Sequence, residues 1–224
     1  MQDWQLPYLG RRAFPAELSD FELRQFFTFD EIERAGIRQA FRSRLRLGAA
    51  LQLGFLRLTG ATLRSMEYVP ATVLKLLGSQ LGVPAPDLAT LRALYRREMT
   101  RMAHQSWAID YAGFRALDSD GEALLIAFLR DRTTSSITKP RLEQDARAWL
   151  HRNSYLIPRA RWLTQSVRAA IRTVTSEDHA ALVKAVGATS LGACLGRLLE
   201  RRDGHTMTHL EWLRRPPGKR SLKT

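Results

Sequence analysis

Arginine is the residue type in this sequence whose spacing could do chemistry. Its guanidinium is always charged and presents a planar fork of N–H donors, which fits phosphate oxygens and the edge of guanine. The arginines gather in three groups. The first is Arg34, Arg38, Arg42 and Arg46, which recur every four residues, with Arg44 in the turn beside them; the others are Arg92, Arg96, Arg97 and Arg101, and Arg159, Arg161, Arg168 and Arg172, with Trp162 nearby. Three such groups on separate elements are typical of a protein that lies along a duplex. An ordinary solvated basic surface is the alternative interpretation.

Signatures of catalysis are not recognisable in the sequence. It contains no glycine-rich phosphate loop that ends in Lys-Ser or Lys-Thr, no GxGxxG after a strand and no Gly-x-Ser-x-Gly elbow. His205 and His209 are spaced four apart, but no Cys or His set surrounds them, as zinc would require. Asp118 and Asp120 lie in an ordinary Asp-Ser-Asp-Gly turn. We therefore expect no catalytic centre, no metal site and no cofactor in this chain.

The charge balance favours a polyanionic partner. The 224 residues include 35 Lys and Arg against 22 Asp and Glu, which gives a formal net charge of +13. Nucleic acid is the first partner that such an excess favours, and an anionic membrane surface is the second. A genome rich in arginine codons is another source of the same excess.

The apolar residues predict a packed interior and no membrane span. They make up 45% of the chain, which is enough for a core. The most apolar stretch, Leu47 to Leu58, is interrupted by Gln52 and Arg57 and is too short to cross a bilayer. Cys194 is the only cysteine, so we expect no disulfide and a buried thiol. These features predict a cytoplasmic protein, associated with the nucleoid.

Helical periodicity dominates, and no segment alternates as a strand would. Ser19-Asp20 predicts one helix start, and Thr28 with Glu31 predicts the capping box of the next helix. Ser43 predicts the start of an apolar helix. A turn around Arg42-Ser43-Arg44 would give a helix–turn–helix-like pair with cationic residues at its junction. The sequence therefore predicts an all-α fold.

The longest pattern runs from Leu88 to Tyr111 and predicts one continuous helix. Its apolar face holds Leu88, Leu91, Tyr95, Met99, Met102 and Ile109, and its opposite face holds Arg97, Arg101, His104 and Gln105. The polar face is either a solvated surface or the side that lies against a DNA backbone or groove. Farther on, Thr175-Ser176-Glu177-Asp178 predicts a new helix start between a helix ending at Val174 and one beginning at Ala180.

A domain boundary is expected near the acidic turn Asp118-Ser119-Asp120-Gly121, which follows Gly113. We expect two small helical subdomains, built as helix–turn–helix-like bundles, over residues 1–117 and 118–215. The basic tail, residues 216–224, is expected to be disordered.

An ordered set of motifs between about residues 14 and 215 resembles one family. The block Arg46-Leu47-Gly48-Ala49-Ala50-Leu51-Gln52-Leu53-Gly54-Phe55-Leu56-Arg57 resembles that family's "RLGFALQLCFLR" stretch, and Thr100-Arg101-Met102-Ala103-His104-Gln105 matches its "TRxxHQ" element. The other matching segments are Leu18 to Leu23, Phe26 to Thr28, Val69 to Val73, Gln80 to Gly82, Tyr111 to Arg115, Leu156 to Pro158 and Leu210 to Arg214. The set resembles the N-terminal region of Tn-three-family replicative transposases.

The resemblance implies a helical region that binds the terminal inverted repeats of a transposon. In such transposases, two aspartates and a glutamate hold the divalent metal for cleavage and strand transfer. The resemblance implies that they lie in a catalytic domain downstream of this region, so no catalytic residue is carried over and we expect no enzyme here.

Double-stranded DNA of transposon ends is therefore the expected partner. The residues predicted to contact it are Arg42, Arg44, Arg46, Arg97, Arg101, His104, Gln105, Arg115, Arg161 and Arg168. For His104 a buried structural role is the alternative. The alternative function is a protein-interaction module that pairs with and regulates full-length transposase, or forms a homodimer.

Overall fold

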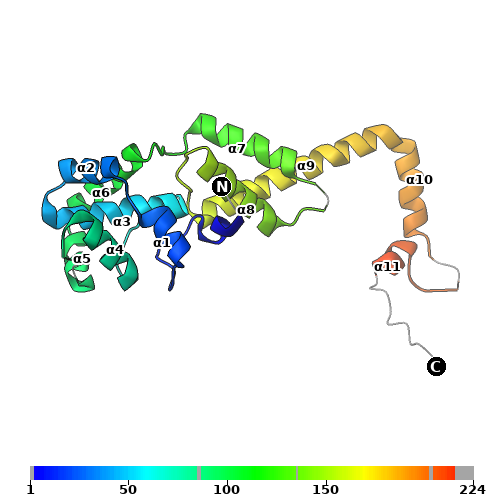
Figure 1. Cartoon of the computed structure of the whole chain (residues 1–224). Helices are drawn as coiled ribbons and strands as arrows, with labels where there is room; N and C mark the ends of the chain where they lie inside the picture. The colour runs from blue at the N-terminus through cyan, green and yellow to red at the C-terminus, as the bar shows by residue number, and fades with distance from the viewer. Residues whose placement is uncertain (1–2, 85–86, 135, 202–203, 215–224) are drawn as a thin grey trace, which may run out of the picture. The chain divides into compact units, whose positions relative to one another are not determined.

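The computed structural model describes residues 3–84, 87–134, 136–201 and 204–214. These residues form eleven α-helices, one 3-10 helix and no β-strand, so the predicted all-α class is confirmed (Figure 1). The elements are η1 (Asp3–Tyr8), α1 (Asp20–Phe27), α2 (Glu31–Ala40), α3 (Ser43–Thr59), α4 (Ala71–Leu81), α5 (Leu88–Tyr95), α6 (Glu98–Tyr111), α7 (Ser119–Arg132), α8 (Lys139–Arg152), α9 (Ala160–Val186), α10 (Ala188–Leu199) and α11 (His209–Leu213). The chain divides into two compact units, of which the first ends at Ile171 and the second begins at Arg172.

Helix α3 lies at the centre of the first hydrophobic core. Every residue from Leu47 to Leu56 is buried, because the helix is apolar around its circumference there and needs cover on all sides. Helices α1, α2, α4 and α6 pack against it (Figure 1). At Gly54 a Cβ atom would lie 2.4 Å from Cδ1 of Phe27. The close approach of α1 to α3 therefore depends on this glycine.

A second hydrophobic core lies between α7, α8 and the first turns of α9. Leu125, Leu150 and Leu163 are fully buried in it. Backbone hydrogen bonds tie it to the first core, because the Ile157 N–H donates to the carbonyl of Gly60 at 2.8 Å. Both cores lie within the first compact unit. The subdomain boundary expected between residues 117 and 118 stays a prediction.

The second unit holds the later turns of α9 together with α10 and α11. None of the side chains described between residues 172 and 214 is buried. Helix α10 packs against the short α11, which begins with a capping box of Thr208 and Glu211. The expected burial of Cys194 is wrong, since this thiol is exposed on a helix that has no interior to enclose it. The predicted disordered tail, residues 216–224, lies outside the described residues.

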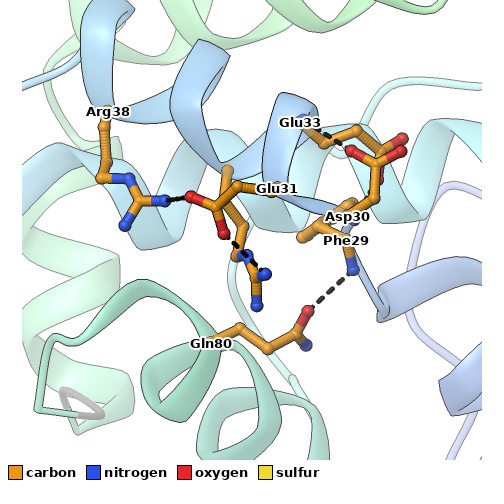
Figure 2. A network of polar contacts seen from close by, with 7 residues as sticks. Phe29, Asp30, Glu31, Glu33, Arg38 and Gln80 are labelled. Carbon is orange, nitrogen blue, oxygen red and sulfur yellow. Dashed lines mark hydrogen bonds and ion pairs between the residues drawn. The ribbon is translucent and has the colours of Figure 1, made fainter.

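The capping box before α2 lies two residues later than predicted. Thr28 follows the last residue of α1 in an extended conformation, and Asp30 accepts the Glu33 N–H at 2.8 Å while Glu33 accepts the Asp30 N–H at 2.9 Å. The Phe29 N–H donates to Gln80 Oε1 at 2.7 Å (Figure 2). Because Phe29 turns its ring into the core and gives its N–H to α4, the helix starts after it.

The predicted helix from residue 88 to 111 is broken at Arg96 and Arg97, which separate α5 from α6. The break changes the phase of the second half. His104, expected on the polar face, is fully buried, whereas Met99, expected inside, is 80% exposed. The physical reason is that Tyr95 and His104 both turn towards α3, which no single straight helix allows for residues nine apart.

The helix start predicted at residues 175–178 is also wrong, because α9 runs through it without interruption. Capping residues interrupt a helix only where the backbone leaves helical geometry, and no Gly or Pro stands beside them here. Among the described residues, no single helix is long and apolar enough to cross a membrane. The bent pair Ala160–Val186 and Ser190–Leu199 meets the length and composition criteria, which is weak evidence because core helices meet them too.

Candidate nucleic-acid interface

The first arginine group contains side chains that the protein already holds. On α2, Arg34 and Arg38 both pair with Glu31, at 2.7 and 2.5 Å (Figure 2). On α3, Arg46 donates from Nε to the Phe41 carbonyl at 3.0 Å and so helps to close the end of α2. A fork held in this way would have to give up its present partner to bind a phosphate fully.

Arg42 and Arg44 are the free members of this group. Both are exposed, and neither side chain has a hydrogen bond or ion pair with another residue in the described part of the chain. They flank Ser43, the predicted and confirmed first residue of α3. The N-terminal turn of a helix adds unpaired N–H groups and partial positive charge to the two guanidiniums. This end of α3 is therefore suited to an anion.

The second group is arranged around the N-terminal end of α6. Arg97 is the N-cap residue and is exposed without a side-chain partner among the described residues. Arg101, one turn into the helix, pairs with Glu98 at 3.0 Å. Arg92 has a structural role, because its Nε donates to the Met66 carbonyl at 3.0 Å. Arg97, like Arg96 before it, is therefore an available guanidinium of this group.

His104 lies inside the first core and not on a surface. Its Nδ1 is 3.1 Å from the Tyr95 hydroxyl, which lies 3.1 Å from the carbonyl of Gly48. Since that hydroxyl donates to the carbonyl, the geometry assigns the histidine proton to Nδ1. Burial lowers the pKa of His104 from 6.5 to about 4, so the ring is neutral at pH 7. His104 is therefore a structural residue and not the DNA contact that the sequence predicts, because a duplex cannot reach a fully buried side chain.

Gln105 also serves the fold. Its Nε2 donates to the Leu63 carbonyl at 2.9 Å. The same carbonyl accepts from Nε2 of Gln52 at 2.7 Å, and Oε1 of Gln52 accepts the Leu63 N–H at 3.0 Å. Gln52 thus pairs with a backbone segment as a strand neighbour would, and Gln105 completes the pairing. Both glutamines fix the chain that follows α3.

The remaining predicted contacts divide in the same way. Arg115 lies over the ring of Tyr155, with its guanidinium carbon 4.3 Å from the ring centre, and donates to the tyrosine hydroxyl at 2.7 Å. Arg161 and Arg168 are exposed on α9, and no hydrogen bond or ion pair joins them to other described residues. A separation of seven residues places them on one helix face, two turns apart.

A basic pocket in the first unit has no signal in the sequence. Arg12, Arg64 and Arg159 line it together with Trp162 and Glu122. Only Arg159 and Trp162 belong to a recognised group, since Arg12 and Arg64 are distant in the chain and each looks isolated. No local pattern indicates this convergence, which comes from the meeting of the two cores.

The described residues contain no group of three or more His, Cys, Asp or Glu placed to hold a metal ion. What the arrangement offers is fixed positive charge. Five guanidiniums from the predicted set have no described protein partner, and they lie on α3, α6 and α9 or directly before them. They are Arg42, Arg44, Arg97, Arg161 and Arg168. Such groups suit phosphate oxygens, which they contact without regard to sequence.

Comparison with known families gives a match over most of the chain. The family described as Domain of unknown function (DUF4158) matches residues 10–170. This range includes all of the predicted contact residues from Arg42 to Arg168.

Curated relatives are transposases. The chain is 34% identical over all of its 224 residues to "Transposase for insertion sequence element IS1071 in transposon Tn5271" of Comamonas testosteroni. It is 29% identical over 207 residues, 92% of its length, to "Transposase for transposon gamma-delta" of Escherichia coli strain K12. The chain spans only 23% and 20% of these two relatives. The resemblance to transposases of this kind, predicted from the ordered motifs, is confirmed.

Proposed function

Because the chain belongs to the DUF4158 family and its relatives are transposases, we propose that it binds double-stranded DNA during transposition. The DNA that it contacts is the terminal inverted repeat of a Tn-three-type transposon. Cleavage and strand transfer belong, in this proposal, to parts of a transposase that the chain does not span. Its own share is to hold the transposon end.

The observation that carries the proposal is the set of five exposed guanidiniums without described protein partners, on a chain of net charge +13. A free fork loses only water and side-chain freedom when it meets a phosphate, whereas a tied fork also loses a protein partner. Arg42, Arg44, Arg97, Arg161 and Arg168 therefore anchor the backbone. The side chains of three other arginines are already bound within the fold and help to position the anchoring arginines. They are Arg46, Arg101 and Arg115.

The test is fluorescence anisotropy with two labelled duplexes over a salt series. One duplex carries the inverted repeat that flanks the source gene, and the other is a shuffled copy. Five phosphate contacts predict a slope of log K against log salt of about −4 to −5. A preference for the repeat at physiological salt supports end recognition. Equal, steeply salt-dependent binding to both duplexes would reduce the proposal to backbone binding.

Variants locate the interface. Arg42→Gln/Arg44→Gln and Arg97→Gln should each weaken binding to both duplexes and lower the magnitude of the slope by about 1 for every arginine removed from a phosphate. Arg24→Gln is the matched control, because Arg24 is an exposed arginine of α1 outside the proposed interface. If the control loses as much affinity as Arg97→Gln, net charge and not position explains the binding.

A second function is favoured by the second unit. Its helices expose large apolar side chains, with Leu182 57%, Leu195 51%, Leu199 61% and Leu213 61% exposed. Exposed apolar surface of this kind is typical of an interaction site. In this alternative the chain pairs with full-length transposase, or with a second copy of itself, and regulates it. Light scattering and co-purification with tagged full-length transposase test this alternative. A chain that is monomeric and does not co-purify with the transposase counts against it.

A further inference from the structure

The pocket in the first unit brings together chain segments that are far apart in sequence. Its walls come from Arg12, from Arg64 after α3, from the start of α7 at Glu122, and from residues 156–159 with Trp162. The cavity has a volume of about 540 Å³. That is far more than a single water occupies and falls within the range of small-ligand sites.

Three guanidiniums line this cavity, and little negative charge from the protein lies beside them. Arg12 is half-buried and donates from Nη2 to the Ile157 carbonyl at 2.5 Å, which fixes its position. Arg64 and Arg159 are exposed and have no hydrogen bond or ion pair with the rest of the described chain. Burial, and then the charges of Arg64 and Arg159, lower the pKa of Arg12 below its ordinary value. Arg64 and Arg159 therefore each lie close enough to Arg12 to repel its charge.

Glu122 is the one carboxylate that lines the described pocket. It forms no ion pair with a described arginine, so it leaves an excess of positive charge at the cavity. A bound anion would reduce the mutual repulsion of the three guanidiniums, which gives its binding a direct electrostatic gain. Guanidinium forks bind carboxylates and phosphates by paired hydrogen bonds, and a phosphate offers more negative charge to three converging arginines.

The rest of the wall is apolar and partly aromatic. Trp162, in the first turn of α9, is half-buried, and Leu117 and Pro158 also line the cavity. An inorganic ion would leave this apolar surface uncovered. A phosphate ester that carries a sugar and a base would cover this surface, since any of the bases can stack on a tryptophan ring. The dimensions and the two-sided lining therefore fit a nucleotide better than a bare ion.

We infer that the pocket of Arg12, Arg64, Arg159 and Trp162 binds a phosphate ester, as one nucleotide unit of the DNA that the chain holds. The guanidiniums take the phosphate, and Trp162 packs against the sugar or base. The assignment to DNA rests on the proposed function. A free nucleotide has the same chemistry and is the other source of the ligand.

The test has two arms, both with the full chain. In the first, tryptophan fluorescence is followed while a deoxynucleoside monophosphate or inorganic phosphate is added. Trp162→Phe isolates the contribution of one tryptophan among five. We expect the nucleotide to quench Trp162 and Arg64→Gln/Arg159→Gln to weaken this at least tenfold. Arg24→Gln, which removes an exposed guanidinium of α1 outside the lining, should leave it unchanged.

In the second arm, the same double variant is titrated with duplex DNA. If the double variant loses nucleotide binding and the magnitude of its salt slope falls by about 1, the pocket ligand is a phosphate of the DNA. A loss of nucleotide binding with unchanged duplex binding supports a free phosphate ester as the ligand. If neither nucleotide nor phosphate quenches Trp162, and the double variant binds duplex as the wild type does, the pocket assignment is overturned while the proposed function stands. A wild type that binds nucleotide but no duplex sinks only the proposed function.

Discussion

Replacing the two glutamines that hold Leu63 tests whether they serve the fold or the DNA. Gln52→Leu keeps the size of the side chain but removes its bonds to both the N–H and the carbonyl of Leu63. Leu63 is fully buried, so its N–H then has no partner. An unsatisfied buried donor costs about 1–3 kcal/mol. We expect Gln52→Leu to lower the free energy of unfolding by about 2 kcal/mol.

Gln105→Leu should cost less, because the Leu63 carbonyl still accepts from Gln52. Loss of one such hydrogen bond is worth about 1 kcal/mol. The double variant leaves both the N–H and the carbonyl of Leu63 unpaired, so its loss should exceed the sum of the two single losses by roughly 1 kcal/mol. This excess is a specific signature of a shared backbone partner.

The assay combines urea unfolding with duplex anisotropy. A loss of 1 kcal/mol corresponds to a fall in Tm of roughly 2–4 °C for a unit of this size. At a temperature where all variants are folded, Gln105→Leu should bind the inverted repeat as the wild type does. If it loses about tenfold in DNA affinity while its stability is unchanged, Gln105 contacts the duplex and the structural assignment is refuted.

Three further predictions test the fold. Gly54→Ala would place Cβ 2.4 Å from the buried ring of Phe27. We expect a lower free energy of unfolding, because overpacking costs about 1–3 kcal/mol and helix propensity returns about 1 kcal/mol. An unchanged urea midpoint would contradict the close packing. Asp30→Ala should lower the free energy of unfolding by about 1 kcal/mol, because Asp30 is the N-cap of α2, and Thr28→Ala should lower it by under about 0.5 kcal/mol. The reverse order would place the cap at Thr28. For His104, burial lowers the pKa from 6.5 to about 4, so its contribution is complete above pH 6.5 and declines by about 3 kcal/mol as the pH falls to 4. Urea unfolding at pH 7 and pH 4 of the wild type and of His104→Asn measures this decline as the difference between the two proteins. An equal fall in both would exclude His104 as its source.

The helical class and several helix starts can be predicted because they depend on local chemistry. Ser19 and Ser43 mark starts that the structure confirms. The errors arise where a distant contact decides between local alternatives. Phe29 is bound by Gln80, 51 residues away, and this moves the cap of α2 from Thr28 to Asp30. No window around residue 28 contains that information.

The break between α5 and α6 is hidden for a related reason. Arg96 and Arg97 are acceptable helix residues, so propensity alone predicts no break there. The break is set by α3, where Gly48 leaves space for both Tyr95 and His104. Periodicity carried across the break then assigns His104 to the wrong face. The pocket arginines escape notice in the same way, since only the folded chain brings Arg12 and Arg64 together.

The availability of an arginine fork is decided by what already holds it. Arg46 is bound to a carbonyl five residues away, and Arg115 lies on a tyrosine 40 residues away. Such forks contribute to the long-range potential that attracts DNA, but they gain little from a direct phosphate contact because they must first leave a partner. A net charge of +13 therefore overstates the number of phosphates that the chain can hold. The salt slope reports the number of phosphates neutralised and not the total charge. We therefore expect a slope that matches the arginines anchored on the DNA backbone and not the full net charge.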